Sequence, residues 1–252
     1  MRIMTGIGCL LLLAGCASTA EPAAPAPSPT AVAAPSPTRT CAVAELDDKQ
    51  VTFPGRTGAP LGAYVLGAGN VTLVLAPQAG ATGCSWLAWA KRQAAAGFRV
   101  VAFDFNGEGR SRRVETGRNS DDVAAAAAYA RAGGGKVVLI GASRGGTATL
   151  VAATALDPAP DAVISLSAPA EYGGESAQAA VPGLRAPVLY VAAKSDWAFG
   201  RDAQAMYDAT PAPGRRLTLV AGVQHGTELM VNTAEGTADA VKAVDDFLAT
   251  AH

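Results

Sequence analysis

One stretch of this chain, Lys136 to Gly146, limits the possible fold more than any other. It reads KVVLIGASRGG, in which four bulky apolar residues, Val137 to Ile140, precede a serine flanked by glycines. An unbroken apolar run of this kind is typical of a strand buried on both faces of a parallel sheet. The glycines permit a sharp turn after the strand, and the segment from Thr147 to Leu156 predicts a helix. We therefore expect Ser143 at a turn between a buried strand and a helix.

The alternation of strand and helix recurs from Val51 to the C-terminus. Such alternation favours an α/β fold with a mostly parallel sheet and helices on both faces. The expected strands are 51–53, 63–66, 71–75, 99–103, 136–140, 162–166, 187–192 and 216–221. The expected helices are 85–96, 121–132, 147–156, 202–209 and 234–249.

Gly141, Ser143 and Gly145 fit the pattern Gly-x-Ser-x-Gly. In its strand-turn-helix context this stretch resembles the nucleophile elbow of the α/β-hydrolase family, and the resemblance extends from about Val51 to the C-terminus. A glycine-rich turn without chemistry is the alternative. The resemblance implies an α/β-hydrolase fold with an approximately eight-stranded sheet. Only about twenty residues separate the sixth and seventh expected strands, so no large lid domain is expected there.

A serine hydroxyl becomes a good nucleophile when a neighbouring base takes its proton. The chain contains two histidines. His252 is the last residue, whereas His225 follows the last expected strand, where the family resemblance places the catalytic histidine. Asp196 follows the seventh expected strand and is the expected acid, because the order serine, acid, histidine is that of the family. Asp202 is the alternative acid, although it better suits the cap of the helix that follows.

The resemblance also implies two backbone N–H groups that stabilise the oxyanion of the reaction. One is the N–H of Arg144, directly after the serine. The other is expected in the loop after the third strand, where Pro77 and Gln78 replace the family's histidine and glycine. Ala79 is the first choice for this donor and Gln78 the second. The guanidinium of Arg144 either binds an acidic substrate or makes a structural ion pair.

The segment from Asp104 to Arg112, DFNGEGRSR, is similar to a family turn of the form Asp-x-x-Gly-x-Gly-x-Ser. This turn is structural in the family, and we expect the carboxylate of Asp104 to accept backbone hydrogen bonds. A phosphate-binding loop is the alternative. It is a poor one, because the segment lacks the third glycine and the lysine of such loops.

The three tryptophans of the chain have different expected roles. Trp86 and Trp89 are three residues apart on an expected helix and should pack in the core. Trp197 follows Asp196 and is expected to line a pocket for the acyl group. The chain has no clustered histidine and cysteine ligands, so neither a metal nor a cofactor is expected.

The N-terminus predicts a lipoprotein signal peptide over residues 1–15. Arg2 precedes an apolar run, 3–13, that is too short for a permanent membrane span but suits a signal-peptide core. Leu13 to Cys16, LAGC, then matches the bacterial lipobox, which implies lipidation of Cys16 and a membrane-anchored protein of the cell envelope. An ordinary secretory signal with an incidental cysteine is the alternative.

Residues 16–40 are expected to form an extended tether, because alanine, proline, serine and threonine dominate the segment and cannot build a core. The hydrolase domain is then expected over 41–252. In an oxidising compartment Cys41 and Cys84 are predicted to form a disulfide. Two buried free thiols are the alternative, because spacing alone does not determine pairing.

The composition is that of a globular protein of one folded domain, with 252 residues, 50% hydrophobic residues and a net charge of -1. There is no basic surplus that would suggest nucleic acid binding. The expected function is that of a serine hydrolase, which cleaves carboxylic esters or related acyl compounds through Ser143, Asp196 and His225. Acyl transfer, thioester cleavage and peptide cleavage use the same three residues, and a non-catalytic envelope binding protein is a further alternative. A monomer is the default expectation.

Overall fold

A computed structural model describes residue 41 and residues 44–115 and 117–250. The chain divides into two units, Met1–Ala34 and Pro35–His252, and every described residue belongs to the second. The predicted signal peptide, the predicted lipidation site Cys16, the expected tether and His252 lie outside the described residues. Within those residues, no helix has the length and apolar character that crossing a membrane requires.

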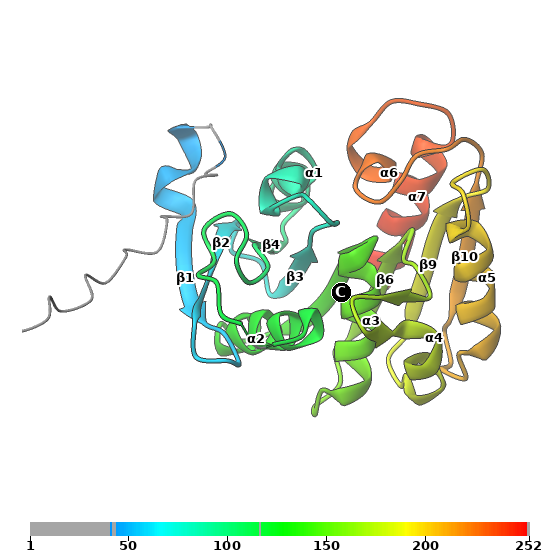
Figure 1. Ribbon diagram of the computed structural model, residues 1–252. Coiled ribbons are helices and arrows are strands. Elements are labelled where there is room, and N and C mark those ends of the chain that lie inside the picture. The colour runs from blue at the N-terminus through cyan, green and yellow to red at the C-terminus, as the bar shows by residue number, and fades with distance from the viewer. Residues whose placement is uncertain (1–40, 42–43, 116, 251–252) are drawn as a thin grey trace, which may run out of the picture. The chain divides into compact units, whose positions relative to one another are not determined.

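One sheet of eight strands forms the centre of the folded unit (Figure 1). Its order is β1-β2-β4-β3-β5-β6-β9-β10. The pairs β1·β2 and β2·β4 are antiparallel, and the other pairs are parallel. The strands are β1 (Gln50–Pro54), β2 (Pro60–Leu66), β3 (Val71–Ala76), β4 (Arg99–Phe103), β5 (Lys136–Ala142), β6 (Ala162–Leu166), β9 (Val188–Ala193) and β10 (Arg216–Val220). The expected α/β fold with a largely parallel sheet of eight strands is confirmed.

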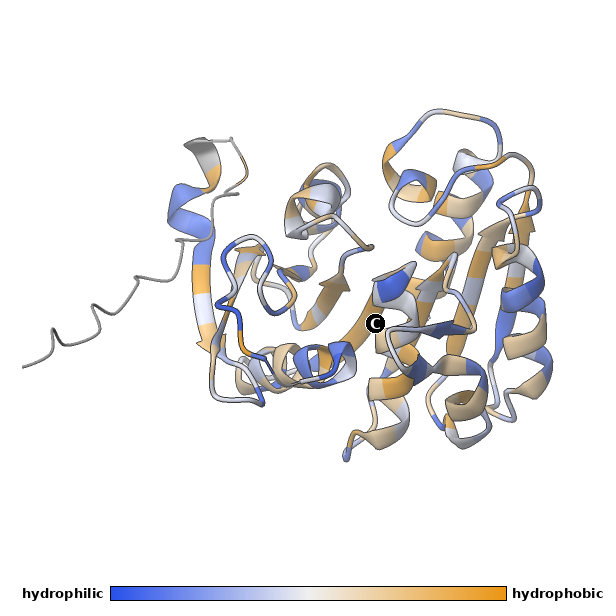
Figure 2. Cartoon of the chain, in the orientation of Figure 1, coloured by the Kyte–Doolittle hydropathy of each residue, from blue (hydrophilic) through white to orange (hydrophobic). Residues whose placement is uncertain are grey.

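Helices cover both faces of this sheet. They are α1 (Leu87–Ala95), α2 (Asn119–Ala132), α3 (Arg144–Ala155), α4 (Ala177–Ala180), α5 (Phe199–Ala209), α6 (Glu228–Val231) and α7 (Thr237–Leu248). Short 3-10 turns are η1 (Ala44–Lys49), η2 (Gly83–Trp86) and η3 (Val181–Gly183). Buried residues of α1, α6 and α7 pack on one face, whereas those of α2, α3, α4 and α5 pack on the other. In Figure 2 the central strands are coloured as hydrophobic, while α5 shows both hydrophilic and hydrophobic residues.

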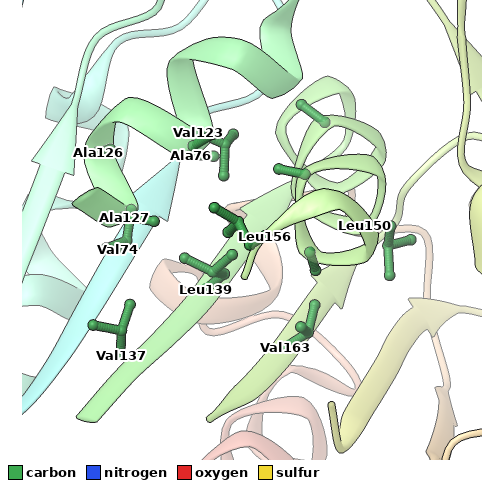
Figure 3. Packing of buried hydrophobic residues seen from close by; sticks show 14 of the residues in the cluster. Val74, Ala76, Val123, Ala126, Ala127, Val137, Leu139, Leu150, Leu156 and Val163 are labelled. Carbon is green, nitrogen blue, oxygen red and sulfur yellow. The ribbon is translucent and has the colours of Figure 1, made fainter. Parts of the chain in front are cut away.

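The central strands are buried on both faces because successive side chains point to opposite sides of the sheet. In β5, Val137 and Leu139 belong to the core cluster under α2 and α3, while Val138 and Ile140 belong to the cluster under α1 and α7. Figure 3 shows the first cluster, in which Leu139 lies among side chains of the two helices. The unbroken apolar run of β5 is therefore a consequence of its central place.

The segment between β6 and β9 contains no large lid. It forms a hairpin of β7 (Glu171–Tyr172) and β8 (Glu175–Ser176), followed by α4 and η3. This hairpin was not predicted from the sequence. Its two-residue turn, Gly173–Gly174, has positive φ angles of 59° and 79°, which glycine adopts without steric cost.

A disulfide joins Cys41 to Cys84, with Cα atoms 5.4 Å apart, so the predicted pairing is confirmed. Cys41 also donates its backbone N–H to the hydroxyl of Tyr64 at 3.0 Å. These contacts attach the start of the folded unit to β2 and to η2. The neighbouring Trp86 and Trp89 are fully buried, as expected for packing residues, with ring centroids 5.8 Å apart.

Candidate active site

Ser143 lies at a strained turn between β5 and α3. Its backbone has φ 49° and ψ -119°, a conformation that residues other than glycine seldom adopt. Strain of this kind persists only where the surrounding structure enforces it, and it is common at functional sites. Here the N–H of Ser143 donates to the carbonyl of Leu166 at 2.8 Å, while its own carbonyl accepts from Thr147 at 3.1 Å. Helix α3 consequently begins at Arg144, three residues before the expected start.

The glycines of the elbow are required by contact with other backbone atoms. A Cβ on Gly141 would lie 2.2 Å from the carbonyl oxygen of Gly145, and a Cβ on Gly145 would lie 2.4 Å from that of Ala76. Gly146 faces the methyl group of Ala168, which a Cβ would approach to 2.7 Å. The spacing Gly-x-Ser-x-Gly therefore lets α3 start against the ends of β3 and β5.

Asp196 and His225, which are 29 residues apart, meet at the carboxyl ends of β9 and β10. The Nδ1 atom of His225 lies 2.9 Å from Oδ2 of Asp196. The Asp196 side chain is buried, at 7% exposure, and that of His225 is 27% exposed. With the Nδ1 proton donated to the carboxylate, Nε2 is left as the unprotonated acceptor of the ring. The alternative acid, Asp202, instead accepts the N–H of Ala170 at 3.1 Å.

The loop that carries His225 lies against the serine turn. A Cβ on Gly226 would be 3.4 Å from the Cβ of Ala142, the residue before Ser143. Within the described part of the chain, no hydrogen bond joins the Ser143 hydroxyl to His225. The structure therefore brings the aspartate and histidine into direct contact and places the histidine loop beside the serine turn.

Two contacts support the position of the His225 ring and its loop. The ring of Phe199 packs on that of His225, with centroids 4.4 Å apart. The backbone N–H of His225 donates to Oε2 of Glu228 at 3.2 Å.

Trp197 packs against the other aromatic residue of this region, with its ring centroid 5.9 Å from that of Phe199. Its side chain is 86% exposed, and its backbone has φ 39°. It therefore stands at the surface near His225, not in the wall of a buried pocket.

The loop after β3 contains the two candidates for the second oxyanion donor. Ala79 is exposed, and its N–H donates to none of the described residues. Gln78 is partly buried, and its carbonyl accepts from the N–H of Ala81 at 3.2 Å. The N–H of Arg144 is at the first position of α3, where no helical carbonyl precedes it. The assignment of Arg144 and Ala79 as the pair of oxyanion donors stays a prediction.

The side chain of Arg144 is engaged within the protein. Its Nη1 and Nη2 atoms each lie 2.6 Å from one carboxylate oxygen of Glu108, which is a bidentate pair. The guanidinium also lies over the ring of Phe105, 4.4 Å from its centroid, and the side chain is only 9% exposed. The structural ion pair, not recognition of an acidic substrate, is therefore the role of this guanidinium. Glu108 could not be identified from the sequence as the partner of this guanidinium, because no spacing rule relates it to Arg144.

The turn after β4 is structural, as expected. The carboxylate of Asp104 accepts the backbone N–H of Gly83 at 2.7 Å and that of Arg110 at 2.8 Å. Gly109 is necessary here, because a Cβ at this position would lie 2.2 Å from Oδ2 of Asp104. Burial raises the pKa of Asp104, and the two hydrogen bonds oppose this effect. Asp104 thus holds η2 and the loop after β4 together.

Asp122, in the first turn of α2, predicts a measurable dependence of stability on pH. Burial raises its pKa from 3.8 to about 6, although Oδ2 accepts the N–H of Asn106 at 2.8 Å. Because the folded pKa is above the unfolded one, the folded state binds this proton more tightly. The free energy of unfolding should therefore fall as pH rises from about 4 to about 6. Asp122→Asn should remove this component and stabilise the protein at pH 8 by about 2 to 3 kcal/mol.

Urea unfolding between pH 4 and pH 8 would measure the effect of Asp122→Asn. The control is Asp121→Asn, which removes the neighbouring carboxylate from the same helical turn. The control should keep the loss of stability between pH 4 and pH 6. Parallel pH profiles for the wild type and Asp122→Asn would contradict the prediction.

Among the described residues, no group of three or more histidine, cysteine, aspartate or glutamate side chains is arranged to hold a metal ion. The residues at the candidate site are instead a serine, an oriented histidine and a buried carboxylate. Chemically, such a group can take a proton from a hydroxyl and return it to a leaving group.

Known structures share this fold at low sequence identity. An esterase from Pyrococcus furiosus superposes with a TM-score of 0.65 at 15% identity, covering 80% of this chain and 91% of its own. A monoacylglycerol lipase from Paleococcus ferrophilus has a TM-score of 0.65 at 16% identity, covering 76% of this chain and 99% of its own. A thermophilic esterase from Thermogutta terrifontis has a TM-score of 0.65 at 16% identity, covering 81% and 99%.

No curated protein matches this sequence significantly. The family model described as "Alpha/beta hydrolase family" matches residues 73–249, a span that runs from β3 to the end of α7 and contains the serine turn, Asp196 and His225. The match covers well over half of the chain. This protein therefore belongs to the alpha/beta hydrolase family.

Proposed function

We propose that this protein is a serine hydrolase that cleaves carboxylic esters through a triad of Ser143, Asp196 and His225. The observation that carries the proposal is the 2.9 Å contact between His225 and buried Asp196, in a loop that packs beside the strained turn of Ser143. Esterases and a monoacylglycerol lipase among the similar structures support an ester as the substrate.

In the proposed reaction, Nε2 of His225 takes the proton of the Ser143 hydroxyl as the oxygen attacks the ester carbonyl. The N–H groups of Arg144 and Ala79 stabilise the negative charge on the carbonyl oxygen. His225 then gives the proton to the leaving alcohol, and the acyl group remains on Ser143. A water molecule, deprotonated by His225, releases the acid and restores the serine. Asp196 orients the imidazole and stabilises its protonated form.

Labelling with a fluorophosphonate probe tests the proposal, because the probe reacts covalently with an activated serine. The wild-type protein should carry one adduct, located on Ser143 by peptide mass spectrometry. His225→Ala should abolish labelling, while the control His252→Ala, which removes the other histidine, should label as the wild type does. A folded wild-type protein without an adduct would refute the triad and favour a binding function.

We also propose that the mature protein is anchored to the bacterial membrane by lipid on Cys16. The support is the sequence LAGC after an apolar run, followed by the segment 17–40, which is long enough to serve as a tether. In a bacterial host, Cys16→Ser should abolish labelling by a fatty-acid analogue and release the protein from the membrane fraction. Cys9→Ser is the control and should change neither result. A lipidated Cys16→Ser protein would show the anchor assignment to be wrong.

A further inference from the structure

The side chain of Gln78 reaches from the loop after β3 to the loop that carries His225. Its Oε1 atom accepts the backbone N–H of Thr227 at 2.9 Å and the hydroxyl of Thr227 at 3.0 Å. The two residues are 149 positions apart in the chain. One amide oxygen therefore holds the residue two positions after His225 by two hydrogen bonds.

The histidine loop is shaped to admit this amide group. Gly226, directly after His225, has φ 57°, a left-handed conformation that glycine adopts without strain. A Cβ at this position would lie 2.4 Å from Oε1 of Gln78. A glycine between His225 and Thr227 thus satisfies both the backbone conformation and the space that the Gln78 side chain occupies.

The other end of Gln78 is attached to the nucleophile side of the site. Its backbone carbonyl accepts a hydrogen bond from Nη2 of Arg144 at 3.3 Å, and the same nitrogen pairs with Glu108. Arg144 is the residue directly after Ser143. A continuous series of contacts therefore runs from Glu108 through Arg144 and Gln78 to Thr227, and it connects the serine turn to the histidine loop.

We infer that Gln78 is a positioning residue, which sets the distance of His225 from Ser143 by holding the histidine loop against the serine turn. The inference rests on the proposed function. Asp196 orients the His225 ring through Nδ1, but this contact does not fix the backbone of the histidine loop. Other contacts must therefore position that backbone, because Val223 in the same loop is exposed. A misplacement of reacting groups by about 1 Å can cost about 100-fold in rate.

The test is Gln78→Met, which keeps the length of the side chain but removes the oxygen that accepts from Thr227. Hydrolysis of p-nitrophenyl acetate should show kcat reduced about 10- to 100-fold, with KM within about two-fold of the wild type. The matched control is Gln93→Met, which removes a side-chain hydrogen bond to Asp245 between α1 and α7. The control should lower the melting temperature and leave kcat unchanged.

A double-mutant cycle with Thr227→Val assigns the effect to the contact. Thr227→Val removes the hydroxyl donor and leaves the backbone N–H in place. If the two residues act together, the double variant should have the same kcat as Gln78→Met alone. Fully additive losses, together with an unchanged exchange rate of the Thr227 amide in Gln78→Met, would show that Gln78 acts by another route and would overturn the inference.

Hydrogen exchange tests the contact between Gln78 and Thr227 independently of catalysis. The amide of Thr227 should exchange at least ten-fold faster in Gln78→Met than in the wild type, and the helices of the core should keep their protection. If the wild type is labelled at Ser143 but Gln78→Met keeps full kcat, only the role of Gln78 is overturned. A wild type that is not labelled overturns the proposed function, and the catalytic role of Gln78 with it.

Discussion

Replacement of Ser143 by alanine should lower kcat/KM for ester hydrolysis by about four to six orders of magnitude. In the proposed mechanism the acyl-enzyme cannot form without the hydroxyl, because His225 then has no nucleophile to deprotonate. The residual rate should then reflect only substrate binding and the two proposed oxyanion donors. The measurement is hydrolysis of p-nitrophenyl esters by the purified variant.

The fold should survive this change. The strained backbone conformation at position 143 costs no more free energy for alanine than for serine. The Ser143 hydroxyl, moreover, makes no hydrogen bond to the described residues. Ser195→Ala is a suitable control, because Ser195 is exposed and precedes Asp196 directly. It should retain activity within about two-fold. Activity of Ser143→Ala within ten-fold of the wild type, from protein shown to be free of contaminating esterase, would rule out Ser143 as the nucleophile.

Substitution of Gly145 by alanine should strongly destabilise the fold, although it adds only one methyl group to the elbow. Its Cβ would lie 2.4 Å from the carbonyl oxygen of Ala76 and 2.7 Å from that of Pro77. Both contacts are with backbone at the end of the central strand β3, which cannot move without disturbing the sheet. We expect a loss of about 3 kcal/mol or more in the free energy of unfolding, measured in urea.

Gly183→Ala is the matched control for this measurement. Gly183 ends η3, and a Cβ added at this position would contact only the Cβ of Thr154, at 4.0 Å. This substitution should change stability by less than about 1 kcal/mol. Equal stability of the two variants would mean that α3 can move away from β3, and that the close approach at the elbow does not require glycine.

Most of the fold was predictable because its signals are local. The strands β4 and β6 have the bounds expected from their apolar runs, and the Gly-x-Ser-x-Gly pattern correctly placed a sharp turn between β5 and α3. The hairpin of β7 and β8 was not predicted. Each of its strands has only two residues, too few to show an alternating pattern.

The sequence by itself indicated the strands along the chain, and it pointed to Ser143, Asp196 and His225 as candidates, because each follows a recognisable strand. Their catalytic roles stay a prediction, and the order of the strands in the sheet came from the tertiary structure. The sequence also indicated the disulfide partners, since only two cysteines follow the tether. Only the tertiary structure decided which side chains support these residues. Glu108 pairs with Arg144 across 36 positions, and Gln78 meets Thr227 across 149. Such contacts arise where loops converge at the carboxyl edge of the sheet, and no periodicity or spacing along the chain encodes them.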